Sequence, residues 1–316
     1  MSNATSISQQ PFFHRIRLFL ALSRTPHGIL DMATPALGAL LWLGAFPPWP
    51  VMVLGLLTAF AGYTAVYALN DIIDYRVDKE RVQFGKHRAS ESYLDDVLVR
   101  HPMAHGLLSF RAGLLWTVAW SLVALIGAYI LNPICVLIFI GGCLLEIIYC
   151  LMLKVSYLRT VISGGVKTTG AVAAVFAVDP DPRMIFLFFL FLWLFLWEIG
   201  GQNIPHDWAD IEEDVQLNTD TIPVRFGPVR STALIVVTLG VAFCLSVISF
   251  FHSKIDYESI FFLAAGFAGV FFLVLPAWQL YKTKQRDEAM ALFNKASYYP
   301  LSLLGVVMVK LVFFTP

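Results

Sequence analysis

The sequence predicts an all-α, polytopic membrane protein with nine transmembrane helices around a central cavity. Of its 316 residues, 58% are hydrophobic and only 14% are charged, whereas soluble domains carry roughly 25% charged residues. The apolar residues also gather in runs long enough to cross a bilayer, which takes about 20 residues per helix. The formal net charge is zero, so no global field favours nucleic acid as a partner.

Nine apolar runs are expected to cross the membrane, with boundaries good to a few residues. They cover residues 19–46, 51–69, 107–131, 134–153, 157–178, 184–202, 231–251, 259–281 and 298–314. Prolines separate several of them, as in the FPPWP stretch after the first run and at Asn132-Pro133 after the third. Residues 1–17 form a polar tail that lacks the apolar core and cleavage site of a signal peptide. Membrane insertion therefore depends on the internal runs.

The nine runs divide into two similar halves within one domain that spans residues 1–316. Residues 19–154 are expected to supply four helices, residues 155–281 four more, and residues 298–314 a ninth. An even number of crossings separates the second run from the sixth, so the halves have the same orientation. Pseudo-symmetry about an axis along the membrane normal would then bring these two helices face to face across the cavity.

The first candidate site is the end of the second run, NDIIDYRVD at residues 70–78. On a helix, Asp71, Asp74 and Asp78 stand at positions i, i+3 and i+7 and share one face. Asn70 lies on the same side because it precedes Asp74 by four residues. Three carboxylates so close together repel one another unless cations lie among them.

The same spacing returns after the sixth run at Asp207, Asp210 and Asp214, each 136 residues after its counterpart. A single acidic helix end is most simply a solvated terminus. Two copies with identical spacing, each closing an apolar run, favour a functional site instead. We therefore take all six aspartates as candidate metal ligands and catalytic residues.

Carboxylate oxygens suit Mg²⁺, which proteins usually hold through one or two carboxylates together with phosphate oxygens of a substrate. Two facing carboxylate clusters therefore predict a metal site for a diphosphate, with Mn²⁺ as a substitute metal. The cavity beyond them would be apolar and aromatic, which suits a long hydrocarbon tail beneath a charged head.

The positions of the basic residues predict the orientation in the membrane. With a cytoplasmic N-terminus, 19 of the 22 Lys and Arg residues fall on the cytoplasmic side, and only Arg183, Lys254 and Lys310 fall on the other. Both acidic motifs and the mouth of the site then face the cytoplasm, where soluble phosphorylated metabolites are found. We expect an integral protein of the cell or inner membrane, with its C-terminus on the opposite side.

Basic and amide side chains near the motifs are candidates for contacting the diphosphate. Arg24 lies within or at the mouth of the first run, where it either serves the site or extends to the interface. Lys154 and Arg159 follow the fourth run and either clamp a diphosphate or follow the positive-inside bias. Asn70 and Asn203 complete the candidate set.

Other charged residues have simpler interpretations. Lys167 is taken to mark the return of the chain to a charged surface. Asp31, Glu146 and Glu198 lie inside expected spans, and a neutral or hydrogen-bonded structural carboxyl group is favoured there over a catalytic base.

Two polar segments connect the spans. Residues 79–109 form a long connection that carries several charges, and loops of that length are often lids or binding elements rather than solvated connectors. Residues 282–295 alternate charged and apolar side chains at near-helical spacing. That pattern predicts an interfacial helix.

The motifs and their spacing resemble those of the UbiA superfamily of intramembrane prenyltransferases. Residues 70–78 fit the family's first motif, residues 207–214 fit its second, and TIPVRFG at residues 221–227 is a tail common in the family. The resemblance covers roughly residues 18–314. It implies nine helices around a laterally open chamber, Mg²⁺ between the motifs, and transfer of a prenyl group from an isoprenyl diphosphate to a small acceptor, with release of diphosphate.

Some basic residues also fit the family pattern. Arg24 before Pro26 resembles the basic residue of the family's first helix, and Lys154 resembles the lysine after its fourth. The sequence departs from the family at His101-Pro102, where Arg-Pro is usual. That departure leaves open which basic group of this loop contacts phosphate.

Several alternatives stay open. A UbiA-type terpene cyclase would use the same metal site without an acceptor. A cation or proton transporter usually places its carboxylates near the membrane midplane, and a lipid-binding protein without catalysis would not need both acidic clusters. Acceptors in the superfamily range from quinone precursors and porphyrins to lipid glycerol, and no residue selects among them. The oligomeric state is equally open.

Overall fold

The computed structural model describes residues 12–84 and 98–314, and every regular element in these ranges is helical. Within them, eight helices are long and apolar enough to cross a membrane. They cover Trp49–Ile73, Phe110–Leu131, Pro133–Leu151, Arg159–Val178, Met184–Ala209, Ile222–Phe251, Ser259–Thr283 and Arg286–Phe313. The prediction of an all-helical integral membrane protein is confirmed.

The helices follow one another with short connections. In chain order they are α1 (Phe12–Leu22), α2 (Thr25–Asp31), α3 (Ala33–Leu43), α4 (Trp49–Ile73), α5 (Tyr75–Phe84), α6 (Phe110–Leu131), α7 (Pro133–Leu151), α8 (Arg159–Val178), α9 (Met184–Trp197), η2 (Glu198–Asn203), α10 (Ile204–Ala209), α11 (Ile211–Gln216), α12 (Ile222–Phe251), α13 (Ser259–Gly269), η3 (Val270–Val274), α14 (Leu275–Thr283), α15 (Arg286–Ser297) and α16 (Tyr299–Phe313). Two of the spans contain a π-helical turn, η2 or η3. The span predicted from residue 231 begins earlier, at Ile222.

The first predicted span, residues 19–46, is wrong as one continuous helix, because α1, α2 and α3 divide it. Between α1 and α2, Arg24 has φ 43°, in the left-handed region that non-glycine residues seldom adopt. Pro26 follows in the first turn of α2, where its missing N–H costs no helical hydrogen bond. The chain therefore restarts a helix at this point, and Arg24 lies at a break in the helix.

The span that carries the second acidic motif widens at η2. A Cβ atom on Gly200 would meet Thr238 Oγ1 at 2.2 Å, and one on Gly201 would meet the Ala296 Cβ at 3.0 Å. The two glycines therefore let η2 pack closely against α12 and α15. Wide π turns often occur at functional sites. This one carries the buried polar side chains of Glu198, Gln202 and Asn203.

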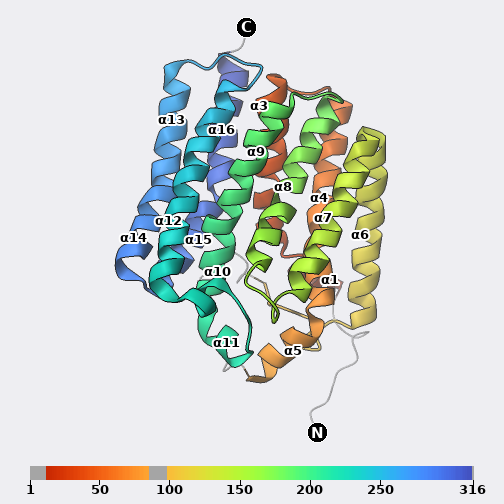
Figure 1. The fold of residues 1–316 in the computed structure, drawn as a ribbon. Coiled ribbons are helices and arrows are strands. Elements are labelled where there is room, and N and C mark those ends of the chain that lie inside the picture. The colour runs from red at the N-terminus through yellow and green to blue at the C-terminus, as the bar shows by residue number, and fades with distance from the viewer. Residues whose placement is uncertain (1–11, 85–97, 315–316) are drawn as a thin grey trace.

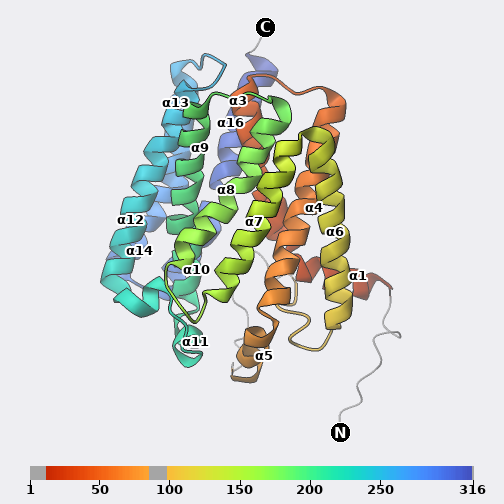
Figure 2. The ribbon, with the colours of Figure 1, turned by 45° about the vertical axis from the view of Figure 1, so that its right-hand side comes forward.

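The helices form one bundle. α4 packs against α6 and α7, α8 against α3, α7 and α9, and α12 against α9, while α16 packs against α3 and α13. In both views α6 and α14 lie toward opposite edges, and α5 and α11 project together at the lower end (Figures 1 and 2). Large apolar side chains such as Leu115 on α6 and Phe267 on α13 are exposed, as expected for surfaces that face lipid.

Candidate active site

Both acidic motifs lie at the end of the bundle where α5 and α11 project (Figure 1). The expectation of one continuous helix across residues 70–78 is wrong, because the chain breaks at Asp74, between α4 and α5. It breaks in the same way at Asp210, between α10 and α11. Asp74 has φ −81° and ψ 0°, and Asp210 has φ −98° and ψ 9°. The sequence repeat therefore comes with a repeat of the backbone geometry.

A guanidinium group and an imidazole group face the first motif. Arg24 Nη2 lies 3.3 Å from Asp71 Oδ1 and donates to Asn70 Oδ1 at 3.1 Å. His101 Nδ1 lies 3.3 Å from Asp71 Oδ1 and 3.0 Å from Asp78 Oδ2. One ligand atom each from Asp71, Asp78 and His101 lies within 4.8 Å of the other two. These three residues could hold one metal ion together.

Two arginines from the first half of the chain extend to the second motif. Arg81 Nη2 on α5 lies 3.4 Å from Asp214 Oδ1, and Arg100 Nη2 in the loop before α6 lies 3.5 Å from Asp210 Oδ2. Arg81 Nη1 also lies 3.9 Å from Asp78 Oδ1. Arg81 thus bridges the motifs and joins the acidic ends of both halves in one site.

Arg159 approaches the second motif from the start of α8. Its Nη1 lies 3.3 Å from Asp207 Oδ1, and its guanidinium carbon lies 4.0 Å from the centroid of the Tyr149 ring. Tyr149 Oη accepts a hydrogen bond from Asn203 Nδ2 at 3.0 Å. Among the described residues, the buried Asp207 Oδ2 and Asn203 Oδ1 have no hydrogen-bond partner. Buried polar atoms are rarely left so, and both oxygens are available to a ligand.

The charges at this end of the cavity leave room for cations. Six aspartates face four arginines and two histidines there. They are Asp71, Asp74, Asp78, Asp207, Asp210 and Asp214, with Arg24, Arg81, Arg100, Arg159, His101 and His206. Carboxylate oxygens therefore exceed the cationic groups, and hard oxygen donors suit Mg²⁺. The open Asp207 Oδ2 and the convergence of Asp71, Asp78 and His101 fit a bound divalent metal.

The proton affinities of these groups are strongly shifted. Burial and the charge of Asp78 raise the pKa of Asp74 above its ordinary value. Burial also disfavours ionised Asp210, but the charges of Arg100, His206 and Arg81 together outweigh it and hold the pKa of Asp210 well below its usual range. Burial lowers the pKa of His101, but the charges of Asp78 and Asp71 together outweigh this effect and raise that pKa. Opposed shifts within one cleft are typical of functional sites.

Four of the five candidate diphosphate ligands, Arg24, Asn70, Arg159 and Asn203, line the cavity. Lys154 is placed differently, since it lies outside the cavity wall and donates to Glu80 Oε2 at 2.6 Å. Its side chain is 38% exposed. The structure therefore gives Lys154 a surface ion pair and no contact with the acidic motifs.

A cavity of about 550 Å³ extends from the acidic motifs into the bundle. All six aspartates contribute to its wall at one end. Farther along, its wall is largely apolar and is made in part by small residues of α4 and α8. These are Gly55, Ala59, Gly62, Ala173, Ala174 and Ala177. A hydrocarbon chain whose head lies among the aspartates fits this shape.

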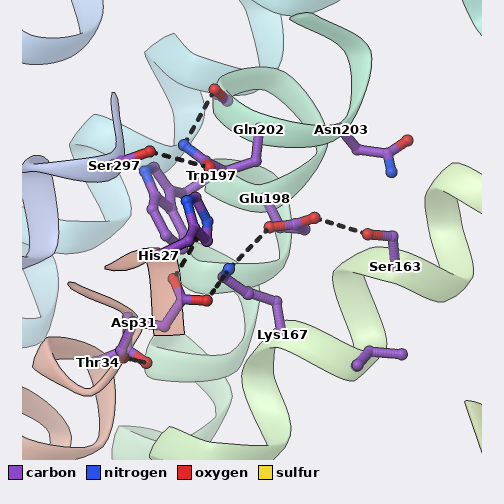
Figure 3. Close-up of polar contacts among 12 residues, drawn as sticks. His27, Asp31, Thr34, Ser163, Lys167, Trp197, Glu198, Gln202, Asn203 and Ser297 are labelled. Atoms are coloured by element: carbon purple, nitrogen blue, oxygen red, sulfur yellow. Dashed lines mark hydrogen bonds and ion pairs between the residues drawn. The ribbon is translucent and has the colours of Figure 1, made fainter. Parts of the chain in front are cut away.

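A second polar group lies deeper in the same cavity, between α2, α4, α8 and η2. Figure 3 shows its side chains from α2, α8 and η2. We call it the inner polar cluster, and it consists of His27, Asp31, Tyr67, Ser163, Lys167 and Glu198. Lys167 Nζ donates to Asp31 Oδ2 at 2.6 Å and lies 3.9 Å from Glu198 Oε2. Ser163 donates to Glu198 Oε1 at 2.6 Å, and Tyr67 donates to Asp31.

The inner polar cluster corrects one sequence-based interpretation. Lys167 was expected at a charged surface, but its side chain is only 11% exposed. A charge inside a membrane bundle is stable when it is paired, and Asp31 and Glu198 provide those pairs. The expected hydrogen bonds to these two carboxyl groups, and to Glu146 from Asn70 Nδ2 at 2.7 Å, are present. All three carboxylates also line the cavity.

Sequence reasoning missed several residues of the site. Arg81 follows Asp78 by three residues, a spacing that could have placed both on one helix face. The sequence left open which basic residue of this loop contacts phosphate. In the structure Arg100 lies beside Asp210 and His101 beside Asp78. Phe293 lines the cavity from α15, which packs into the bundle instead of forming the expected interfacial helix.

The long connection at residues 79–109 is described only in part. Its beginning continues α5, and residues 98–109 bring Arg100 and His101 to the aspartates. Residues 85–97 lie outside the described ranges. The expected role of this connection as a lid therefore stays a prediction.

Comparison with known proteins gives consistent matches. The model of the UbiA prenyltransferase family matches residues 32–299. A 4-hydroxybenzoate octaprenyltransferase of Tolumonas auensis is 23% identical over 95% of this chain and 96% of its own. A protoheme IX farnesyltransferase 1 of Pseudomonas fluorescens is 26% identical over 97% of each chain. A UbiA homologue from Archaeoglobus fulgidus, solved with GPP and Mg²⁺, has a TM-score of 0.65 at 16% identity and covers 92% of this chain and 100% of its own.

Proposed function

The chain belongs to the UbiA prenyltransferase family, and from this premise we propose that it transfers a prenyl group from an isoprenyl diphosphate to a small acceptor in a Mg²⁺-dependent reaction. The prediction of a prenyltransferase is confirmed by that membership. One observation carries the finer proposal: two acidic motifs with the same backbone break meet at the mouth of one cavity, whose farther wall is apolar. Such a site suits a substrate with a diphosphate head and a hydrocarbon tail.

The six aspartates are the proposed metal ligands, and His101 is a further candidate at the first motif. When bound, Mg²⁺, or Mn²⁺ as a substitute, would supply positive charge against the diphosphate. The homologue solved with GPP and Mg²⁺ supports this choice of metal and substrate class. Asp207 Oδ2, buried and open among the described residues, is a ready ligand atom.

The arginines around the motifs are the proposed diphosphate ligands. Arg24, Arg81, Arg100 and Arg159 each pair with an aspartate of the motifs. Their guanidinium groups would hold phosphate oxygens through charge-assisted hydrogen bonds, and a bound metal would supply the positive charge that the aspartates then need. They would stabilise the negative charge that gathers on the diphosphate as the carbon–oxygen bond breaks. Asn70 and Asn203 lie beside them.

The aromatic and apolar wall serves the other product of that bond cleavage, the allylic cation. Tyr63, Tyr67 and Tyr149 line the cavity. Aromatic faces attract cations, and an apolar wall keeps water from the cation, which suppresses hydrolysis. The acceptor then supplies the electron pair for the new bond and loses a proton.

We further propose that α1 and both motifs face the cytoplasm and that the end of α16 faces the opposite side. The count of basic residues supports this orientation. α2 and α3 would together form the ninth crossing, which begins just after the break at Arg24. The matching breaks at Asp74 and Asp210 support two pseudo-symmetric halves in one UbiA-type domain.

A terpene cyclase of the same family is the remaining alternative. The inner polar cluster favours transfer, because a cyclase would need only apolar and aromatic walls around its hydrocarbon substrate. Family membership argues against a transporter, although the inner polar cluster does place carboxylates deep in the bundle.

Product analysis tests the proposal. We expect purified protein, offered prenyl diphosphates and a panel of acceptors, to form prenylated acceptor with Mg²⁺, to stop in chelator, and to recover with Mg²⁺ or Mn²⁺. Mass spectrometry identifies the product. Full activity in chelator would refute the metal site, and cyclic hydrocarbon from prenyl diphosphate alone would identify a cyclase.

A further inference from the structure

The inner polar cluster lies beyond the acidic motifs, toward the middle of the bundle. On α4, Tyr67 precedes Asp71 by four residues, and on α8, Lys167 follows Arg159 by eight. At a helical rise of 1.5 Å per residue, these separations are about 6 Å and about 12 Å. The cluster therefore lies one to two helical turns beyond the groups proposed to hold the diphosphate, close to where an acceptor must meet the allylic carbon.

The cluster faces open space. All six of its residues line the cavity, and Lys167 lies between Asp31 and Glu198 with His27 beside them (Figure 3). A hydrocarbon chain packed against this cluster would offer no hydrogen bond to Glu198 Oε2, the carboxyl oxygen that lacks one among the described residues, and burying a polar atom in this way is unfavourable. This part of the wall therefore suits a polar ligand, whereas the small residues of α4 and α8 suit the prenyl tail.

The hydrogen bonds of the cluster leave one position open. Asp31 accepts from Lys167 and Tyr67, and Glu198 Oε1 accepts from Ser163. Among the described residues, Glu198 Oε2 accepts no hydrogen bond, although the residue is only 7% exposed and Lys167 Nζ lies 3.9 Å away. Because Glu198 lines the cavity, its unpaired carboxyl oxygen is a candidate acceptor for a ligand that donates a hydrogen bond.

The polar groups and the shape of this region further limit the class of ligand that fits. Lys167 already donates to Asp31 and lies beside Glu198, and the open atom is itself a carboxyl oxygen, so this position favours a neutral hydrogen-bond donor over an anionic group. The neighbouring surfaces are flat: the His27 and Phe293 rings stack at 5.5 Å and 17°, and the Tyr63 and Tyr67 rings at 6.5 Å and 27°. Flat aromatic walls suit a planar ring.

We propose that the inner polar cluster is the acceptor subsite and that it takes a neutral, planar, hydroxylated ring whose hydroxyl group donates a hydrogen bond to Glu198 Oε2. This inference rests on the proposed prenyl transfer, because only a transferase needs an acceptor. Lys167 contacts both carboxyl groups and fixes their positions, and the ring lies between Glu198 and the allylic carbon.

Calorimetric titration of the full chain in detergent, with Mg²⁺ and the unreactive analogue farnesyl thiodiphosphate present, tests the subsite. The probes are hydroquinone and 1,4-dimethoxybenzene, which share a ring but differ in hydrogen-bond donors. We expect hydroquinone to bind at least about tenfold more tightly, since the ether leaves the buried acceptor open. Glu198→Leu should remove that preference, and the isosteric Glu198→Gln should weaken it. Glu258→Gln is the matched control, because Glu258 also pairs with a lysine, Lys310, but lies outside the cavity wall.

Each outcome bears on the subsite separately from the transfer reaction. Equal binding of the two probes, no binding of hydroquinone, or an unchanged preference in Glu198→Gln and Glu198→Leu would overturn the subsite. The analogue is titrated first, with and without Mg²⁺. Metal-dependent binding of the analogue without discrimination between the probes rejects the subsite alone, whereas loss of metal-dependent binding in the wild type rejects the proposed function.

Discussion

The two acidic motifs share their spacing and their backbone break but differ in their partners. The first faces Arg24, Arg81 and the imidazole of His101, which lies between two of its carboxylates, whereas the second faces three arginines and has His206 beside Asp210 only. Two of those three, Arg81 and Arg100, come from the first half of the chain. The repeat thus determines the positions of the carboxylates, whereas residues distant in sequence provide the basic side chains around them. Two identical motifs give two unequal sides of one site.

The largest expected effect follows from substituting one aspartate in either motif, because both motifs are proposed to act together on one diphosphate. Asp74→Asn or Asp210→Asn should each lower turnover at least about 100-fold, because each removes a proposed ligand of the metal that would hold the same diphosphate. Since the sides act together, the double variant should be scarcely worse than either single one. Initial rates are measured beside thermal stability in detergent. Near-normal rates, or losses that follow unfolding, would show that the repeat is structural.

The arginines test whether both sides contact the diphosphate. Arg24→Met on the first side and Arg100→Met on the second should each raise KM for the prenyl diphosphate about tenfold or more, since a hydrogen bond to a charged group contributes roughly 1.5–3 kcal/mol. Arg225→Met is the control, because that side chain is 60% exposed and should change KM little. An effect confined to one side would mean that the diphosphate lies against one motif only.

His101 tests the difference in metal ligands. We expect Mn²⁺ bound to the wild-type protein to show ¹⁴N modulation from an imidazole nitrogen in pulsed electron paramagnetic resonance. His101→Asn should lose that signal and weaken Mn²⁺ binding about tenfold, with a smaller effect on Mg²⁺, because nitrogen ligands favour the transition metal. His105→Asn, an exposed residue of the same loop, should keep the signal. A wild-type spectrum without nitrogen coupling would make His101 a diphosphate ligand instead.

The smallest effect is expected outside the cavity. Lys154→Ala removes an exposed ion pair with Glu80 and should change kcat/KM less than about twofold and stability by at most about 1 kcal/mol. The measurement is the same rate assay with denaturation in detergent. A tenfold loss would place Lys154 on the diphosphate, as its resemblance to the family lysine implies.

Sequence reasoning succeeded where local chemistry decides the structure. The cost of unpaired backbone in lipid makes long apolar runs helical, so the spans were predictable. The spacing of Asp71, Asp74 and Asp78, and its repeat, was enough to predict that the six aspartates lie together, and all six line one cavity. The break at Arg24 was harder, although Pro26 permits a new helix start there.

The ion-pair partners of the charged residues could not be predicted from the sequence, because they depend on how the helices pack. Lys167 carried no local sign of burial, and its partner Asp31 is 136 residues away in the chain. Arg100 finds Asp210 across 110 residues. Gly200 and Gly201 indicate close packing, but a glycine pair does not predict a π turn. Contacts of this kind follow from the fold and cannot be read from spacing.

The small residues along α4 and α8 have a consequence for selecting substrates by length. A Cβ atom on Gly55 would meet nothing within 4 Å, and one on Gly62 would only touch Phe139 at 3.6 Å. A larger side chain at either position can therefore grow inward and shorten the space for the tail while the aspartates stay untouched. In the proposed reaction, this part of the wall would set the length of the prenyl chain that the protein accepts. Single substitutions here are then expected to change the preferred chain from long to short, while the chemistry at the acidic end stays the same.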